Sequence, residues 1–375
     1  MHRRWTGLIL LGCAALIALP LPPAPRPSYA EGPIQAMTSY AAIAYSRPDR
    51  ASPIVGVLSP LAEVILEARS VDAAWILGHS THGGVRGWLL SRHLALPAGA
   101  SVPALLVSSE ALFVPDTAPP SGAYRTISLT SYPAVPARLG QVQAIYERGR
   151  ILGVDAHVVS KIGDCLTDNA HFLTPFSRSQ YNLGRYPFLQ GVVRQFGASL
   201  GYDSLAAHDG LVTSAVLDPL FADPMACLPG ETPLRCEYRV RNPSVAIIMF
   251  GAQDLLYTPA AQFDRNLRRI VHETIQAGII PILSTFPVHV GHLDTSRQFN
   301  QIVVQVALDY DVPLINLWLS LEALPDRGLD DGRHLSDPLT SGGDLTGDNL
   351  RRGFPLRNLL TLQALDAVWR GVAQG

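Results

Sequence analysis

Residues 158–168 read Val158-Val159-Ser160-Lys161-Ile162-Gly163-Asp164-Cys165-Leu166-Thr167-Asp168. The apolar run predicts a buried strand, and the Gly-Asp that follows predicts a turn presenting a small nucleophile, Cys165, at the end of that strand. Near the C-terminus, Asp331-Gly332-Arg333-His334 places an acid and an imidazole close together in the chain. Acyl transfer requires such parts: a nucleophile, a base that takes its proton and a carboxylate that orients the base.

Beyond residue 137, continuous apolar runs alternate with segments whose apolar residues recur every three or four positions. Strands are expected at 158–159, 204–207, 245–250, 279–283 and 313–317, and helices at 138–150, 260–277 and 296–309. This alternation indicates a parallel sheet covered by helices on both faces. Ligands of such sheets bind at the carboxyl ends of strands, which is where Cys165 and Gly251 are expected.

Residues 155–372 resemble the SGNH hydrolases, the GDSL-like esterase superfamily, through three ordered motifs. Gly163-Asp164-Cys165-Leu166-Thr167-Asp168 is similar to the family's Gly-Asp-Ser-x-Thr-Asp, with cysteine for serine. Gly251-Ala252-Gln253-Asp254 is similar to Gly-x-Asn-Asp, with glutamine for asparagine, and Asp331-Gly332-Arg333-His334 to Asp-x-x-His. The resemblance implies a three-layer α/β/α fold of flavodoxin-like type over residues 137–375.

The resemblance also implies roles for these residues. Cys165 would be the nucleophile, His334 the base and Asp331 the group that orients it. The oxyanion hole would combine the Cys165 N–H with Gly210, the candidate for the second motif, and the Gln253 amide. Gly163, Asp164, Gly251 and Asp254 would support the site. Alone, Asp-x-x-His would indicate a salt link in a loop; in register with the other motifs it predicts a catalytic site.

Two departures from the family pattern leave alternatives open. Cysteine is the stronger nucleophile, and a helix start and a nearby histidine are expected to lower the pKa of Cys165. Gln253 keeps the amide donor of asparagine but adds a methylene. If the two changed together, the chain is a hydrolase of an ester, such as an acyl or acetyl group on a carbohydrate. If the site has decayed, the chain is a catalytically inactive binding protein of the cell surface or cell wall. A third interpretation is a redox-sensitive or modified thiol at Cys165.

No cofactor is predicted. No pair among His171, His289 and His292 has zinc-ligand spacing, so no metal is expected either.

The N-terminus has the features of an export signal. Residues 1–30 comprise a basic start, the apolar segment 8–21, and Ser28-Tyr29-Ala30, with small residues before a cleavage point. The alternative is lipid attachment at Cys13, although the apolar segment continues past it. We therefore expect an extracellular or cell-envelope protein.

Export leaves Cys165, Cys227 and Cys236 in the mature chain. Cys227 and Cys236 flank a turn-rich loop and would pair in an oxidising compartment. The alternative is two unrelated buried thiols. With the pair formed, Cys165 stays free.

Residues 35–97 contain five short β-like runs, at 41–45, 54–58, 63–67, 75–78 and 87–90, which predict a small barrel. Ala74-Trp75-Ile76-Leu77-Gly78 and Gly87-Trp88-Leu89-Leu90 resemble the second half of a bacterial SH3-like domain, which implies contact with the cell wall. The alternative is an irregular β cap without a ligand; in either case Trp75 and Trp88 are expected in its core. Residues 98–136, rich in proline, serine and alanine, predict a linker.

The composition agrees with one sizeable core and a small extra module. The chain has 375 residues, of which 47% are hydrophobic and 16% charged, and its net charge is −2. Nothing in this balance predicts a nucleic-acid partner. No feature of the sequence indicates an oligomeric state.

Overall fold

The computed structural model describes residues 34–50, 52, 54–81, 85–100, 102–110, 112 and 123–373. The predicted export signal, with its cleavage point after Ala30 and the alternative anchor at Cys13, lies outside these residues. Within the described part of the chain, no helix has the length and apolar character that crossing a membrane requires.

The main domain is built on a parallel sheet, as predicted. Its strands are β9 (Asp155–Gly163), β11 (Pro243–Met249), β12 (Ile280–Ser284) and β13 (Leu314–Ile315), in the order β13-β12-β11-β9. Every residue of β11 is buried. A strand buried on both faces explains why its sequence is continuously apolar rather than alternating.

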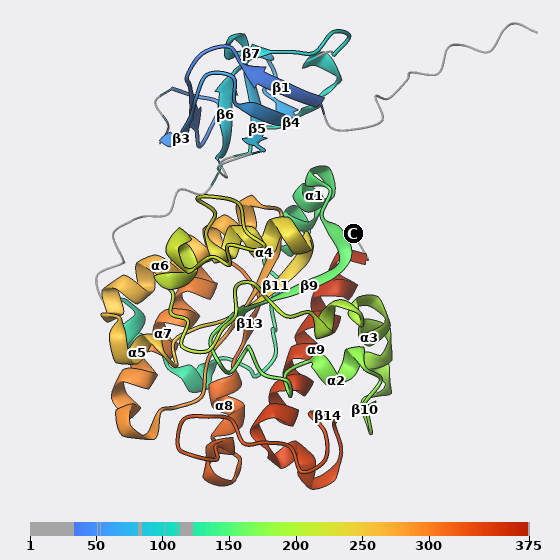
Figure 1. Ribbon diagram of the computed structural model, residues 1–375, viewed down its shortest axis with the longest axis vertical. Helices are drawn as coiled ribbons and strands as arrows, with labels where there is room; N and C mark the ends of the chain where they lie inside the picture. The colour runs from blue at the N-terminus through green and yellow to red at the C-terminus, as the bar shows by residue number, and fades with distance from the viewer. Residues whose placement is uncertain are drawn as a thin grey trace, which may run out of the picture. The chain divides into compact units, whose positions relative to one another are not determined.

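Helices cover the sheet in two groups. Helices α6 (Ala260–Gln276) and α7 (Leu293–Asp309) pack against each other and against β12. Helices α1 (Val142–Leu152) and α3 (Gln190–Phe196) pack against α9 (Gly353–Ala373). The two groups lie on opposite sides of the sheet (Figure 1), which makes this a three-layer α/β/α domain. The remaining helices are α2 (Thr174–Ser177), α4 (Pro233–Arg241), α5 (Asp254–Tyr257) and α8 (Leu317–Leu321).

Two predicted strands are shorter than expected, and in each place a side chain accepts a hydrogen bond from a nearby backbone N–H. Residues 204–207 form only an isolated parallel bridge between Ala207 and Gly163. The Leu205 N–H donates instead to the Glu237 carboxylate (2.8 Å). The strand predicted at 313–317 ends at Ile315, since Asn316 caps α8 by accepting from the Leu319 N–H (3.3 Å).

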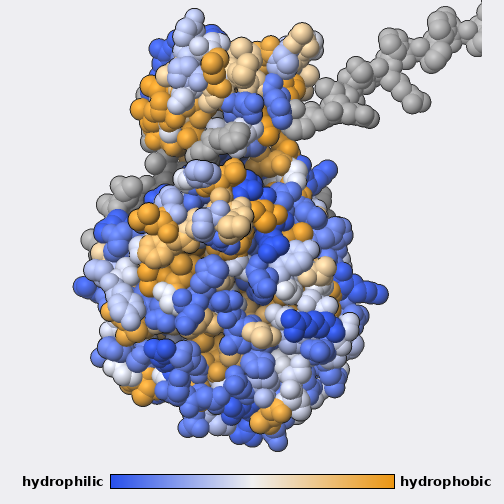
Figure 2. Space-filling model, viewed as in Figure 1, coloured by the Kyte–Doolittle hydropathy of each residue, from blue (hydrophilic) through white to orange (hydrophobic). Residues whose placement is uncertain are grey.

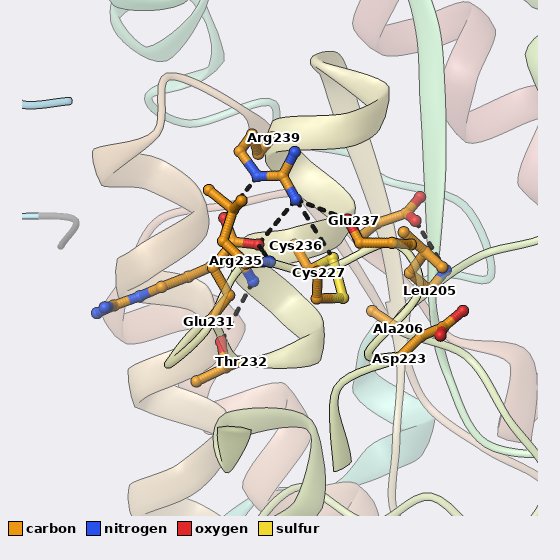
Figure 3. Close-up of a disulfide and its surroundings, with 12 residues drawn as sticks. Leu205, Ala206, Asp223, Cys227, Glu231, Thr232, Arg235, Cys236, Glu237 and Arg239 are labelled. Carbon is orange, nitrogen blue, oxygen red and sulfur yellow. Dashed lines mark hydrogen bonds and ion pairs between the residues drawn. A yellow bond between two sulfur atoms is a disulfide. The ribbon is translucent and has the colours of Figure 1, made fainter. Parts of the chain in front are cut away.

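The disulfide between Cys227 and Cys236 forms as predicted, with the Cα atoms 5.2 Å apart. Cys236 lies on α4. Thr232 is the N-cap of this helix and its hydroxyl accepts from the Arg235 N–H (3.2 Å), and a proline, which is favoured at helix starts, occupies the first turn. Arg239 spans the loop, binding the Glu231 carboxylate and the Ala226 carbonyl (Figure 3). The bridge and Arg239 together tie the turn-rich loop to α4.

The N-terminal unit is a largely antiparallel sheet. Its order is β3-β2-β6-β5-β4-β1-β7, and β8 pairs with β4 in parallel. The strands are β1 (Ile34–Thr38), β2 (Ala42–Tyr45), β3 (Ile54–Leu58), β4 (Glu63–Arg69), β5 (Trp75–Ser80), β6 (Arg86–Leu90), β7 (Leu94–Ala95) and β8 (Leu106–Val107). Trp75 and Trp88 are buried, as expected of core residues. Five of these strands, β2 to β6, were predicted from sequence. The short strands β7 and β8 were not, nor was β1, whose apolar residues are mixed with Gln35 and Thr38.

The predicted linker contains residues that belong to both cores. The Trp88 indole N–H donates to the Glu110 carbonyl (2.7 Å), and Leu112 packs beside Trp88. Further on, Leu129 is buried in the α/β core, and its carbonyl accepts from the Asn316 amide (2.7 Å). Proline-rich composition therefore did not exclude ordered packing.

The surface of the α/β domain is mainly hydrophilic on the face shown in Figure 2, with apolar residues in separate patches. Several of its most exposed apolar side chains belong to the loop that the disulfide closes and the residues before it: Leu220, Phe221, Met225 and Leu228.

Candidate functional site

The nucleophile turn follows directly from β9. A side chain at Gly163 would put its Cβ 2.4 Å from both the Met249 carbonyl and the Thr167 hydroxyl, so only glycine fits. The Asp164 carbonyl accepts from the Thr167 N–H (2.8 Å), and its carboxylate accepts from the Leu166 N–H (3.1 Å). These bonds fold residues 164–168 into a tight turn that carries Cys165, the free cysteine of the described chain.

Asp164 is fully buried, and burial raises the pKa of its carboxyl to about 7, against the Leu166 N–H and the Arg357 charge. Arg357, from α9, is buried beneath the same turn. Its guanidinium donates to the Leu166 carbonyl and to the Thr167 hydroxyl, and lies 3.6 Å from the centre of the Phe172 ring. Burial lowers the pKa of Arg357 to about 9. The sequence analysis missed this residue, because a single arginine in a long helix gives no local signal.

The loop after β11 brings the third motif to Cys165. Gly251 has φ +126°, and a Cβ there would lie 2.1 Å from the Phe286 ring, so glycine is again required. Gln253 is only 8% exposed and directs its side-chain amide to the Cys165 sulfur, at an Nε2–Sγ distance of 3.9 Å. This amide is therefore positioned beside the Cys165 thiol.

Asp254 links the second and third motifs. Its buried carboxylate accepts from the Thr213 N–H (2.9 Å) and from the Thr213 hydroxyl (2.5 Å). The same hydroxyl accepts from the Asn266 amide (3.2 Å). Burial raises the pKa of Asp254 to about 6, although the Thr213 bonds oppose this. The loop that carries Gly210 is thereby attached to the loop that carries Gln253; Thr213 and Asn266 were not predicted from sequence.

Two backbone donors near Cys165 are unused. Within the described residues, the N–H groups of Cys165 and Gly210 donate to no protein acceptor. Gly210 has φ +75°, and no atom lies within 4 Å of where its Cβ would be. The Cβ direction of Gly210 is therefore open, and backbone N–H groups without an acceptor can bind an oxyanion.

His334 and Asp331 form the predicted pair. Asp331 Oδ2 lies 2.6 Å from His334 Nδ1, and Oδ1 accepts from the His334 N–H (2.8 Å) and the Arg333 N–H (3.1 Å). Although burial raises it, these hydrogen bonds hold the pKa of Asp331 well below its usual range. The loop is anchored by the Val290 N–H, which donates to the Gly332 carbonyl (2.8 Å). The carboxylate thus fixes a proton on Nδ1 and leaves Nε2 as an acceptor.

His334 Nε2 does not contact the nucleophile. The Arg333 guanidinium binds His334 Nε2 instead, with its Nε at 3.3 Å and its Nη2 at 3.2 Å. Among the described residues, no hydrogen bond joins His334 to Cys165. The structure therefore contains the Asp331–His334 pair and the Cys165–Gln253 contact without a hydrogen bond between the two.

The expected lowering of the Cys165 pKa is wrong. Burial, followed by the negative charges of Asp164 and Asp209, raises the pKa of the thiol to about 11, and the Gln253 hydrogen bond and Arg333 charge only partly oppose this. The sequence argument assumed direct contact with an imidazole, which is absent within the described residues. At neutral pH Cys165 is a neutral thiol.

The other histidines considered from sequence lie apart from this pair. His289 and His292 stack edge to face, with ring centroids 4.8 Å apart, and His171 lies 3.8 Å from the Asp337 carboxylate.

No protein-family model and no curated protein matches the chain. Among solved structures, a lipase/acylhydrolase from Enterococcus faecalis is 18% identical, with a TM-score of 0.38, over 56% of this chain and 96% of that one. A GDSL-like lipase from Bacteroides thetaiotaomicron is 13% identical, with a TM-score of 0.37, over 60% and 97%. A catalytic mutant of an acetylxylan esterase from Geobacillus stearothermophilus is 17% identical, with a TM-score of 0.36, over 56% and 95%.

Proposed function

We propose that this chain is an exported SGNH-like hydrolase that cleaves an ester, such as an acyl group on a carbohydrate, through Cys165, His334 and Asp331. The observation that carries the proposal is the set of donors around one thiol. The Gln253 amide lies 3.9 Å from Sγ, and the N–H groups of Cys165 and Gly210 have no acceptor within the described residues. A partly buried thiol with unused backbone donors and an amide beside it suits acyl transfer better than it suits a structural role.

The resting thiol is neutral, so its proton must leave as it attacks. His334, with its Nδ1 proton held by Asp331, takes the Cys165 proton on Nε2 while Sγ bonds to the ester carbonyl carbon. The carbonyl oxygen becomes an oxyanion that accepts from the two N–H groups and the Gln253 amide. The alkoxide then leaves with the proton from Nε2, and a water activated by His334 hydrolyses the Cys165 thioester.

This mechanism requires His334 Nε2 to lose its hydrogen bonds to Arg333 and to accept one from the Cys165 thiol. Rotation of the Arg333 side chain alone would free Nε2, because Asp331 holds the ring through Nδ1. Apo hydrogen bonds in catalytic sites commonly tighten only when substrate is bound.

The second candidate is a catalytically inactive cell-surface binding protein. The observation that favours it is the same contact: Arg333 occupies Nε2, and the raised pKa keeps Cys165 protonated. In that case the N-terminal sheet would be an SH3-like module that contacts the cell wall and the α/β domain would supply a second binding surface.

Hydrolysis of p-nitrophenyl acetate by the purified mature chain separates the two. The hydrolase proposal expects Cys165→Ala and His334→Ala to reduce kcat/KM by about 10³-fold or more. The matched control is His157→Ala, an imidazole at the opposite end of β9. Acid-quenched intact-mass analysis should also show one acetyl group on Cys165. Turnover that survives both substitutions refutes the role of this site, and a native protein without turnover or adduct favours the binding protein.

A further inference from the structure

Arg333 stands out because its charge is unpaired beside the proposed nucleophile. Within the described residues no carboxylate lies within 4.0 Å of its guanidinium, whose hydrogen bonds go to His334 Nε2 alone. Neighbouring arginines of the same C-terminal segment behave differently: Arg327 pairs with Glu322 and Arg352 with Asp330. Arg333 is half-buried, so it forgoes part of its hydration without gaining an ion pair.

The part of the guanidinium that contacts His334 is informative. Nε and Nη2 form the edge of arginine that binds a carboxylate through two parallel hydrogen bonds. Both atoms are directed at a single ring nitrogen, which is a weaker acceptor than a carboxylate. A carboxylate reaching this edge would therefore displace His334.

The position of that edge defines which part of an ester would carry the carboxylate. In the proposed mechanism His334 Nε2 first takes the thiol proton and then gives it to the leaving alcohol oxygen. The guanidinium beside Nε2 is therefore on the side of the alcohol, whereas Gln253 and Gly210 serve the carbonyl oxygen.

We propose that Arg333 is a specificity-determining residue that selects esters whose alcohol portion carries a carboxylate. This inference rests on the proposed hydrolase function. The carboxylate of the substrate takes the Nε/Nη2 edge of Arg333, and His334 Nε2 is released to accept the Cys165 proton. Binding of the correct substrate thereby assembles the catalytic pair, which is separated in the free protein.

The other charges around the site fit this arrangement. Asp164, in the nucleophile turn, and Asp209, next to Gly210, both act on the thiol, and their charge would repel a carboxylate placed beside them. Arg357 is buried beneath that turn and already bound to Leu166 and Thr167. Of the cations that influence Cys165, Arg333 is therefore the one available to an incoming anion.

The test compares kcat/KM for hydrolysis of 4-acetoxybenzoate and 4-acetoxybenzamide, two esters of similar size of which only the first carries a negative charge. Each value is divided by the rate at which hydroxide hydrolyses the same ester, which corrects for intrinsic reactivity. The native protein should prefer the anion at least 10-fold in kcat/KM, and Arg333→Leu should bring the ratio close to one. Arg333→Lys should retain part of the preference, since it keeps the charge but loses the two-donor edge. Arg327→Leu is the matched control and should keep the native ratio. A ratio near one in the native protein, or one unchanged in Arg333→Leu, overturns the inference.

A binding measurement separates this inference from the hydrolase proposal. Calorimetric titration with 4-hydroxybenzoate and 4-hydroxybenzamide requires no turnover. If the native protein hydrolyses neither ester but binds the anion, and Arg333→Leu abolishes that binding, the hydrolase proposal fails while the carboxylate site stands. If binding too is indifferent to charge, the carboxylate site is refuted. Hydrolysis of p-nitrophenyl acetate without any charge preference refutes Arg333 selection alone.

Discussion

Shortening Gln253 by one methylene tests the oxyanion site most sharply. In the structure its amide nitrogen lies 3.9 Å from the Cys165 sulfur. Gln253→Asn retains an amide but withdraws the nitrogen by roughly 1.3 Å, about one carbon–carbon bond along the side chain. The donor would then lie about 5 Å from the sulfur and out of hydrogen-bond range of an oxyanion formed there.

The expected loss is that of one oxyanion donor, a factor of about 10²–10³ in kcat, or roughly 2.7–4 kcal/mol of transition-state stabilisation. KM should change little, because this contact strengthens only as charge develops on the oxygen. Gln253→Ala should lose about as much. The assay is steady-state hydrolysis of p-nitrophenyl acetate, with Gln305→Ala on the exposed face of α7 as the matched control.

A kcat within threefold of native in both Gln253 variants would refute the oxyanion role of the side chain. Thermal unfolding of each variant must remain close to native, so that a lower kcat reports the contact and not a damaged fold. The combination Gln253→Asn with Cys165→Ser distinguishes the history of the site. Renewed serine-esterase activity would indicate a decayed site, and its absence a site in which cysteine and glutamine act as a matched pair.

Three further predictions concern stability and ionisation. Replacing Cys227 and Cys236 together by serine should lower the free energy of unfolding, measured in urea, by roughly 2.5–3 kcal/mol, because the bridge closes a loop with a sequence separation of 9. Intact-mass analysis of the oxidised mature chain should find one alkylatable thiol, Cys165. Arg357→Met should cost about 1–3 kcal/mol, since it leaves the Leu166 carbonyl buried without its donor. Arg297→Met on α7 removes only an exposed pair with Asp294 and should cost well below about 1 kcal/mol. Equal costs would contradict this account. Because the pKa of Cys165 is raised to about 11, the rate of its alkylation by iodoacetamide should keep rising up to about pH 11. The folded state retains a proton that the unfolded chain releases near pH 9, so this thiol should lower the free energy of unfolding as pH rises from 9 to 11. An alkylation rate that stops rising below pH 9 would show that the site is more polar than described.

The α/β architecture could be predicted from sequence because its signals are local. Strands β9, β11 and β12 show as continuous apolar runs, and α6 and α7 show as apolar residues spaced three or four apart. Both patterns can be recognised without knowing which segments pack together. The exceptions show the limit of such reasoning. Residues 204–207 look like a strand, yet Glu237, distant in sequence, takes the Leu205 N–H and leaves only one bridge.

Within the site, contacts between close neighbours in the chain were predictable and contacts across the fold were not. Asp331 and His334 meet because three residues of a tight loop bring them together. By contrast, Arg357 reaches Thr167 from 190 residues away, and Thr213 meets Asp254 from a separate loop.

Local sequence was enough to predict the order of strands and helices, the turn that carries Cys165, the disulfide and the acid–imidazole pair, because each depends on periodicity or on residues near one another in the chain. The tertiary structure alone decided the ionisation of Cys165 and the partner of His334. A pKa depends on how much water and which charges surround a group. Packing partly withdraws the thiol from water near Asp164 and Asp209 and places Arg333 against His334 Nε2. A motif that predicts a reactive thiolate therefore contains a neutral thiol, and Nε2 of the nearby acid–imidazole pair is bound by a cation.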